Sequence, residues 1–352
     1  MSSELLLDVL SRFRDCRVAV VGDLMLDRYI WGRASRLSQE APVPVIHVRR
    51  ESNAPGGAAN VVRNILSLGG EASAFGVLGD DAHGRTLCES LLETGADLSG
   101  VLFDPDRPTT VKTRVIAGNQ QVVRIDREEL EPLAEKTAAK VVENVCKAVA
   151  SGRIDAVILE DYAKGVLSID AVATIVNCCA EKSVPVALDP HPSHAFNTPG
   201  LHLITPNRAE AFALAGQYYH SGSLPPLEDE TLLETGRRLL DLWQCDQLLM
   251  TLGGDGMALF RQNAPPVHIP TQAREVFDVS GAGDTVMAAF VLASLADASP
   301  EQAAAIANYA AGIVVAEVGT ATVSARELAE MIANDGKRAL RCPVPDGSGE
   351  TP

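Results

Sequence analysis

Aromatic residues and long apolar runs are what this sequence has least of. Aromatic side chains make up 4% of its 352 residues, although 46% of the residues are hydrophobic. No apolar run approaches the about 20 residues of a membrane-spanning helix, and the N-terminus has no apolar core of a secretory signal. We therefore predict a soluble, cytoplasmic protein with no membrane partner.

Paired cysteines and an excess of positive charge are missing as well. The seven cysteines stand at positions 16, 88, 146, 178, 179, 245 and 342 and form no Cys-x-x-Cys pair. Neither a structural zinc site nor a disulfide framework is therefore supported. The formal net charge of −16 argues against nucleic acid as a partner, so a phosphorylated ligand would need cations concentrated locally.

Two common nucleotide-binding motifs are absent. No Gly-x-Gly-x-x-Gly follows a strand-like run, which argues against a dinucleotide fingerprint. Residues 79–86 have nearly the spacing of a P-loop, but Arg85 stands where a P-loop has lysine. Asp80 and Asp81 inside that loop would also repel phosphates. A nucleotide would have to be bound in another way.

Short β-branched runs instead alternate with helical patterns along the chain. We expect buried strands at 17–21, 156–159, 184–188, 203–205 and 247–251, and helices at 58–67, 133–150, 169–183 and 231–242. This alternation predicts an α/β fold with a mostly parallel central sheet and helices on both faces. Ligands on such sheets bind at the carboxyl ends of the strands.

Two stretches do not follow this alternation. Residues 43–50 and 109–124 read as half-polar strands with no helix between them, which predicts a small β-sheet lid. We therefore predict one domain over residues 1–337, with the lid drawn from about 28–50 and 107–125. The stretch 338–352 is rich in proline and glycine and is predicted to be a disordered tail.

The most informative segment is 278–284, Asp-Val-Ser-Gly-Ala-Gly-Asp, which runs directly into an apolar helical stretch. Amides of Gly281, Ala282 and Gly283 at a helix N-terminus could bind developing phosphate charge. The Asp284 carboxylate would repel a phosphate, so we expect it to act as a base toward an attacking hydroxyl. The segment predicts phosphoryl transfer to an alcohol, and the alternative is a glycine-rich turn with an aspartate cap.

Loops after other strands suit a polyol. Asp23 and Asp27 follow the first strand, where carboxylates could accept hydrogen bonds from hydroxyl groups or could merely cap a turn. Gly56 and Gly57 open a helix and would let a ligand touch the backbone. Asn60 lies one turn further on, where its amide could both donate to and accept from a polyol.

Later loops predict a nucleotide side. Asn207 and Glu210 lie on one face of a starting helix, where their oxygens could hold Mg²⁺ directly or through water. An N-terminal capping box is the alternative for this pair. The loop 251–256 suits backbone contact with phosphate or ribose, with a β-hairpin turn as the competing interpretation. The predicted nucleotide contacts are Asn207, Thr251, Gly253, Gly254, Gly256 and Asn308.

A phosphorylated sugar would also need cations, and the predicted lid concentrates them. Charge-assisted contacts from two or three basic residues could hold an existing phosphate. Alternatively, these side chains are solvated or pair with acids across a dimer interface. The candidate set is Arg33, Arg36, Lys112, Arg114, Arg124 and Lys164.

The motifs resemble those of the ribokinase/PfkB carbohydrate kinases. Residues 56–60 and 278–284 are similar to the two signatures of that family, and the resemblance covers about 15–330. Asn207, Glu210 and the loop 251–256 fall in the expected order between the signatures. The resemblance implies a ribokinase-like fold with ATP and Mg²⁺, with Asp284 as base and the amides of 281–283 as anion hole.

The family resemblance also implies further residue roles. Asp27, Gly57 and Asn60 would hold the sugar, and Asp278 would help to bind a monovalent cation such as K⁺. One branch is especially similar over residues 22–29, 35–36, 40–45, 161–165 and 318–324. That branch is the bacterial D-glycero-β-D-manno-heptose-7-phosphate kinases, which make the 1,7-bisphosphate on the way to ADP-heptose for lipopolysaccharide.

The chain also departs from that branch and leaves alternatives open. Residues 189–192, Asp-Pro-His-Pro, have histidine where relatives often have lysine or arginine. No His-x-Gly-His motif is present, so we expect the kinase half alone. The alternatives are a kinase of ribose, fructose phosphate or a nucleoside, and a catalytically silent sugar- or nucleotide-binding regulator. We also expect a homodimer formed through the lid.

Overall fold

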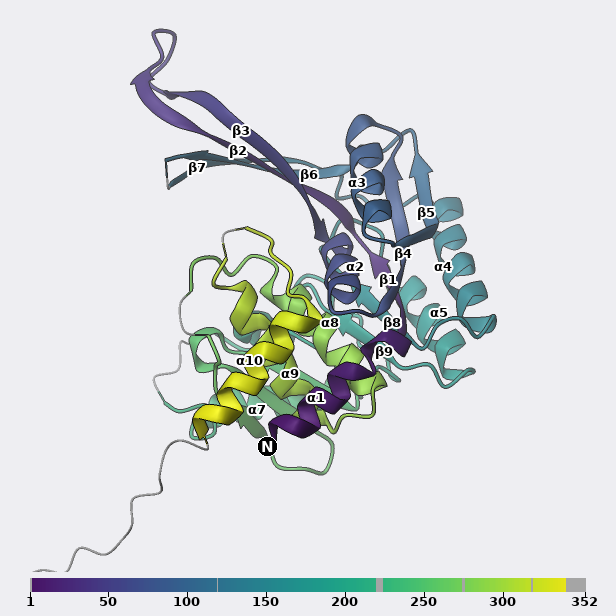
Figure 1. The fold of residues 1–352 in the computed structure, drawn as a ribbon. Helices are drawn as coiled ribbons and strands as arrows, with labels where there is room; N and C mark the ends of the chain where they lie inside the picture. The colour runs from purple at the N-terminus through teal and green to yellow at the C-terminus, as the bar shows by residue number, and fades with distance from the viewer. Residues whose placement is uncertain (1, 119, 220–223, 274–275, 318, 340–352) are drawn as a thin grey trace, which may run out of the picture.

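The computed structural model describes residues 2–118, 120–219, 224–273, 276–317 and 319–339. In this part of the chain, nine strands form a central sheet in the order β13-β12-β11-β10-β9-β8-β1-β4-β5 (Figure 1). Pairing is parallel from β5 to β11 and antiparallel from β11 to β13. The strands are β1 (Arg17–Gly22), β4 (Glu71–Gly79), β5 (Asp97–Asp104), β8 (Ala156–Glu160), β9 (Val186–Asp189), β10 (Leu203–Ile204), β11 (Gln247–Thr251), β12 (Met257–Arg261) and β13 (Val267–Ile269). The predicted mostly parallel sheet is confirmed.

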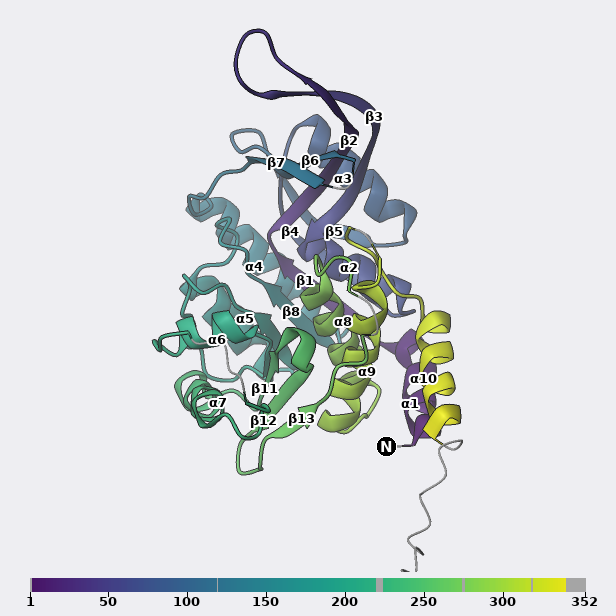
Figure 2. The ribbon, with the colours of Figure 1, turned by 90° about the vertical axis from the view of Figure 1, so that its left-hand side faces the viewer.

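Helices cover both faces of this sheet (Figure 2). The sheet has a hydrophobic core on each face, and alternate side chains of β1 point into one or the other. Val18 and Val20 pack with one helical layer, and Ala19 and Val21 pack with the other. Burial on both faces explains why the strands read as continuous apolar runs. The first layer contains α1 (Ser3–Ser11), α2 (Ala58–Ser67), α3 (Ala82–Glu93), α8 (Ala282–Leu295), α9 (Pro300–Val314) and α10 (Ala325–Ala339), and the second α4 (Glu135–Ala150), α5 (Ile169–Ala180), α6 (Arg208–Leu214) and α7 (Glu230–Trp243).

The predicted lid is a four-stranded sheet that stands above the main body (Figure 1). Its order is β3-β2-β6-β7, built from β2 (Leu24–Leu37), β3 (Pro44–Gly57), β6 (Thr110–Ala117) and β7 (Gln120–Arg127). β2 pairs with β3 in antiparallel and with β6 in parallel orientation. Because β2 follows β1 after one residue, the lid is joined directly to the edge of the sheet where ligands bind.

The ends of several elements differ from the sequence prediction. The strand expected at 184–188 runs from Val186 to Asp189, and the helix expected at 169–183 ends at Ala180. The first two residues of the predicted tail, 338 and 339, end α10, and the rest of that tail lies outside the described residues. Among the described residues, no helix combines the length and the apolar character that a bilayer crossing requires.

Candidate active site

Acidic side chains gather at the carboxyl ends of β1, β8 and β9 and at the N-terminus of α8. Glu160 and Asp189 are the last residues of β8 and β9, and Asp23 follows β1 directly. Asp284 is the third residue of α8 and is buried, with 6% of its surface exposed. Side chains distant in the sequence meet here because parallel strands present their carboxyl ends at one edge of the sheet.

Two hydrogen bonds fix the Asp284 carboxylate. Asn60 donates from Nδ2 to Oδ2 over 2.6 Å, and the Tyr162 hydroxyl donates to Oδ1 over 2.5 Å. Burial raises the pKa of Asp284, and the hydrogen bonds from Tyr162 and Asn60 offset part of that rise. A carboxylate that is held in place and is more basic than usual is suited to accept a proton from a hydroxyl group.

The start of α8 leaves no room for a side chain at Gly281. This residue is the N-cap, its φ is 78°, and a Cβ on it would lie 2.7 Å from Nδ2 of Asn60. Glycine therefore permits both the left-handed backbone and the contact between Asn60 and Asp284. The Ala282 amide donates to the Val279 carbonyl over 3.2 Å, so this predicted anion-hole donor already has an internal acceptor. Gly283 lies in the first turn, where helix amides lack an intrahelical acceptor.

Tyr162 belongs to a loop that Asp23 holds in place. The Asp23 carboxylate accepts hydrogen bonds from the amides of Tyr162, Lys164 and Val166 over 2.9, 3.0 and 3.2 Å. Of the two roles considered for Asp23, the turn-forming one is thus observed. Sequence reasoning gave Tyr162 no role, because a lone phenol forms no motif. Its signals were its place after Glu160 and Asp161 and its position within the stretch 161–165, which resembles one branch of the family.

Asp27 and the glycine pair pack tightly at the base of the lid. Asp27 is buried and accepts from Nη1 of Arg114 over 2.6 Å. A Cβ on Gly56 would lie 2.9 Å from Oδ2 of Asp27, and one on Gly57 would lie 2.5 Å from the Asp23 carbonyl oxygen. Packing against Asp27 therefore requires glycine at position 56, and packing against the Asp23 carbonyl oxygen requires it at position 57. Both contacts are compatible with the predicted sugar contacts of this group.

The Asp27–Arg114 ion pair yields a stability prediction. The two side chains are only 7% and 17% exposed, so Arg114→Ala leaves a buried carboxylate without its cation. We expect this substitution to cost about 3–5 kcal/mol of the free energy of unfolding, measured by denaturant titration. Arg28→Ala is the matched control, because the Arg28–Glu51 pair is more exposed and should contribute less than about 1 kcal/mol. Equal losses in the two variants would contradict the importance of burial.

The candidate phosphate-binding cations differ in what they already contact. Lys164 lies 3.0 Å from Oε2 of Glu128, and Arg124 lies 2.9 Å from Oδ2 of Asp126. The side chain of Lys112 forms no ion pair or hydrogen bond within the described part of the chain, and its Nζ lies 5.4 Å from the centre of the Tyr162 ring. Burial lowers the pKa of Lys112.

The lid strands determine which of the candidate cations lie near each other. Arg114 and Arg124 stand directly opposite each other in the β6–β7 pairing, so they share one face of the lid. Arg33 and Arg36 are exposed on the outer half of β2. Lys112 is therefore the cation of the predicted set that is most available to a ligand near Asp284.

Asn207 and Glu210 form the capping box that was the alternative to a metal site. The Glu210 amide donates to Oδ1 of Asn207 over 3.0 Å, and the Asn207 amide donates to Oε2 of Glu210 over 2.8 Å. Burial raises the pKa of Glu210. The capping role is confirmed, and a role in metal binding, which can coexist with it, stays a prediction.

The other predicted nucleotide and cation contacts have local structural roles. β11 and β12 form an antiparallel hairpin, and a Cβ on Gly256 would lie 2.1 Å from the Ile269 carbonyl oxygen. Asn308 donates from Nδ2 to the Pro270 carbonyl over 2.6 Å. The Asp278 carboxylate accepts from the amides of Ser280 and Gly319 over 2.9 and 3.0 Å. Thr251, Gly253 and Gly254 lie in or beside the turn of that hairpin.

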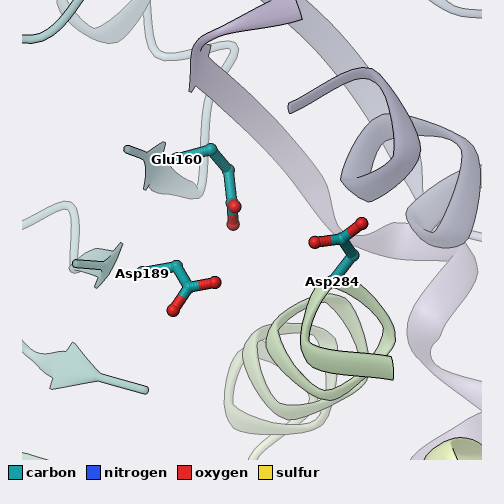
Figure 3. A group of neighbouring side chains, drawn as sticks. All are labelled: Glu160, Asp189 and Asp284. Carbon is teal, nitrogen blue, oxygen red and sulfur yellow. The ribbon is translucent and has the colours of Figure 1, made fainter. Parts of the chain in front are cut away.

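A cluster of acids beside the base was not predicted. Glu160, Asp189 and Asp284 point toward one another (Figure 3). One carboxylate oxygen from each lies within 4.8 Å of the other two. Burial and the neighbouring acids raise the pKa values of Glu160 and Asp189 well above the usual range. The only sequence signal was an acid directly after each of the predicted strands 156–159 and 184–188.

His191, in the segment 189–192 that departs from the related kinases, and the nearby His194 make local contacts. His194 contacts Oδ2 of Asp161 through Nδ1 over 2.8 Å, and His191 contacts the Ser193 hydroxyl over 2.7 Å. Burial lowers the pKa of His191, with smaller effects from Asp161 and His194. Histidine in this segment therefore belongs to the local loop structure.

Comparisons with known proteins agree with this geometry. Residues 16–327 match the pfkB family carbohydrate kinases. The chain is 43% identical over 315 residues to the Bifunctional protein HldE of Geobacter metallireducens. This alignment covers 90% of this chain and 62% of that protein. It is 40% identical over 325 residues to the protein of the same name from Pelobacter propionicus, and this alignment covers 92% of this chain and 65% of that protein. The chain thus spans less than two thirds of the length of these relatives.

Solved structures show the same fold at low sequence identity. Arabidopsis thaliana ribokinase in complex with ribose and ATP matches with a TM-score of 0.71 and 22% identity, over 90% of this chain and 98% of that one. Escherichia coli phosphofructokinase-2 in complex with potassium matches with a TM-score of 0.74 and 18% identity, over 91% and 99%. The predicted ribokinase-like fold is confirmed.

Proposed function

Because the chain belongs to the pfkB family of carbohydrate kinases, we propose that it phosphorylates the anomeric hydroxyl of D-glycero-β-D-manno-heptose 7-phosphate with ATP. The product would be the 1,7-bisphosphate, formed in the cytoplasm on the way to ADP-heptose and lipopolysaccharide. The name HldE of relatives at about 40% identity supports this choice of sugar. The observation that carries the proposal is the buried Asp284, fixed by Asn60 and Tyr162 at the N-terminus of α8.

The proposed mechanism begins with proton removal by Asp284. The anomeric hydroxyl donates to the carboxylate, which accepts its proton as the oxygen attacks the γ-phosphate of ATP in line with the leaving ADP. The amides at the start of α8 would face the negative charge that develops on the transferred phosphoryl group. The Gly283 amide is the best placed of them, because the Ala282 amide already donates to the Val279 carbonyl. Asn60 and Tyr162 orient the base throughout.

The acceptor sugar would lie between Asp284 and the lid. Asp27 and Asn60 are the polar groups near its hydroxyls, and Lys112 is the cation nearest to Tyr162. We propose that Lys112 binds the 7-phosphate, assisted by Arg124 and Lys164 once their present carboxylate partners rearrange. A kinase for neutral sugars would have no need of this basic group.

Kinases of this family use ATP and a divalent metal, and we propose Mg²⁺, with K⁺ near Asp278. Mg²⁺ would neutralise charge on the nucleotide phosphates. Carboxylate and amide oxygens at Asn207 and Glu210 fit a hydrated Mg²⁺, since one carboxylate oxygen of Glu210 is not used in the capping box. The nucleotide would contact the loop 251–256 and Asn308.

Replacing Glu210 with glutamine tests this metal contact. Glutamine can still close the capping box, so the fold of α6 should be kept while one negative charge is lost. We expect the Mg²⁺ concentration that gives half-maximal activity to rise several-fold, with a smaller change in the KM for the sugar. An unchanged Mg²⁺ titration would leave Glu210 with the capping role alone.

We also propose a homodimer through the lid. Val123 and Ile125 on β7 are 46% and 56% exposed, and Leu37 at the end of β2 is 65% exposed. Exposed apolar side chains on a sheet edge favour pairing with another chain. Sedimentation of the protein should give twice the mass of one chain, and a monomer at micromolar concentration would rule the dimer out.

A panel of phosphorylated and neutral sugars with ATP and Mg²⁺ tests the proposed activity. We expect heptose 7-phosphate to give the highest kcat/KM. Preferred turnover of ribose, fructose phosphate or a nucleoside would indicate the same chemistry on another acceptor. Absence of turnover with every sugar would favour a silent binding protein, for which the fixed Asp284 has no evident use.

A further inference from the structure

Two buried polar side chains join the helices that carry Asn60 and Asp284. Asn64 lies on α2 one turn after Asn60, and Thr285 directly follows Asp284 on α8. Asn64 and Thr285 are both fully buried. The Thr285 hydroxyl donates to Oδ1 of Asn64 over 2.9 Å, and Nδ2 of Asn64 donates to the Asn60 carbonyl oxygen over 2.9 Å. A chain of hydrogen bonds therefore connects α8 to the backbone of Asn60.

The chemistry of the acceptors determines the direction of both bonds. The Asn60 carbonyl can only accept, so the side-chain amide of Asn64 must face it with its nitrogen. Oδ1 of Asn64 then faces Thr285, whose hydroxyl has a single proton to donate. The Gly281 carbonyl lies 3.1 Å from the same hydroxyl, but it also accepts from the Thr285 amide over 3.1 Å. Oδ1 of Asn64 has no other donor in the described part of the chain, so Thr285 is the residue that satisfies it.

This chain of hydrogen bonds ends beside the base. Asn60 on α2 donates from Nδ2 to Oδ2 of Asp284 on α8 over 2.6 Å, so the contact depends on how the two helices lie against each other. Apolar side chains between two helices can slide past each other, whereas hydrogen bonds are directional and favour one arrangement. We propose that Asn64 and Thr285 are positioning residues, which hold α2 against α8 so that the amide of Asn60 stays on Asp284.

The test replaces both side chains by apolar groups of similar shape, in the double variant Asn64→Leu/Thr285→Val. The Asn60 carbonyl keeps its helical hydrogen bond, and no buried side-chain group is left unpaired. The double variant is therefore expected to unfold cooperatively at a temperature close to that of the wild type. Its kcat should nevertheless fall about ten-fold or more, because small displacements of catalytic groups are costly. The KM for ATP should change little.

Two single variants are the matched controls. Thr285→Ser keeps the hydroxyl and should retain most of the wild-type kcat. Ser294→Ala removes a hydroxyl from the other end of α8, where Ser294 donates to the Phe290 carbonyl over 2.9 Å, and should leave kcat unchanged. Rescue by serine together with an unaffected Ser294→Ala would separate positioning of the base from a general effect on the helix.

The side-chain amide of Asn60 gives a second measurement that does not depend on turnover. The effect on kcat rests on the proposed kinase function, whereas the contact between Asn60 and Asp284 does not. A charge-assisted hydrogen bond of 2.6 Å deshields the donated proton, so the signal should lie downfield in ¹⁵N-correlated spectra of the full chain. Its absence in Asn60→Ala identifies it. We expect the downfield position in the wild type, Thr285→Ser and Ser294→Ala, and its loss in the double variant.

The two measurements must change together. A folded double variant that keeps both kcat and the Asn60 signal overturns the proposal, as does a change in only one of them or an equal loss in Thr285→Ser. If the double variant does not fold, Thr285→Val takes its place with the same expectations. If that variant also fails to fold, Asn64 and Thr285 serve folding and the proposal is overturned. If the wild type phosphorylates no sugar, the Asn60 signal alone decides the proposal, and only the proposed function fails.

Discussion

Asp284→Asn is expected to lower kcat by about 10²- to 10⁴-fold, the usual effect of losing a general base. Asparagine has nearly the same shape but cannot take the proton from the sugar hydroxyl. The Michaelis constant for ATP should change little, because the carboxylate contacts Asn60 and Tyr162 and is expected to face the sugar rather than the nucleotide. Initial rates with heptose 7-phosphate and a separate ATP-binding measurement check both parts.

Tyr162→Phe is the matched control for the geometry of the base. It removes the 2.5 Å hydrogen bond to Oδ1 but leaves the carboxylate and its contact with Asn60. We expect a loss of kcat that is much smaller than that of Asp284→Asn, because phenylalanine only loosens the orientation of the base. Retention of more than a tenth of the wild-type kcat in Asp284→Asn would refute the assignment of Asp284 as the base.

The fold was predictable because its strands are buried on both faces. Val18 and Val20 belong to one core and Ala19 and Val21 to the other, so the strand appears in the sequence as an unbroken apolar run. β2 was predicted only as part of the lid and not as a strand. Its residues 24–37 change from buried to exposed along its length, which gives neither a continuous nor a regularly alternating pattern.

The site was predictable only where residues form a local motif. Gly281 and Asp284 belong to one short segment, and the distance between them follows from the start of a helix. Tyr162 and Glu160 reach Asp284 across more than 120 residues of sequence, so only the arrangement of β1, β8 and β9 brings them together. Strand-end acids indicate such a site in general but do not reveal which of them touch.

The pairing of charges was equally hidden in the sequence. Lys112 and Arg114 are two residues apart on one strand and appeared to be equivalent candidates for a phosphate. The structure separates them, because Arg114 is bound to Asp27 at 2.6 Å, whereas Lys112 has no acidic partner in the described residues. Arg114 is neutralised by Asp27, which lies 87 residues away in the sequence, so a local motif cannot show this pairing.

Lys112→Ala is therefore expected to raise the KM for heptose 7-phosphate about ten-fold or more. A hydrogen bond to a charged group contributes about 1.5–3 kcal/mol, and about 1.4 kcal/mol corresponds to a factor of ten in affinity. Lys112 is half-buried beside Tyr162, so its contact with a phosphate would be less screened than one at the surface. The KM for ATP should move little.

Comparison with an unphosphorylated sugar separates a phosphate contact from a structural role. If Lys112 binds the 7-phosphate, the slow reaction with the neutral sugar should hardly change in Lys112→Ala. Lys140→Ala is the surface control, because Lys140 pairs with Glu143 on the exposed side of α4 and lies outside the site. Equal losses on phosphorylated and neutral sugars would mean that Lys112 supports the lid and Tyr162, and that the phosphate is held by other cations. Since Arg114 is committed to Asp27, Arg124 and Lys164 would then be the remaining candidates.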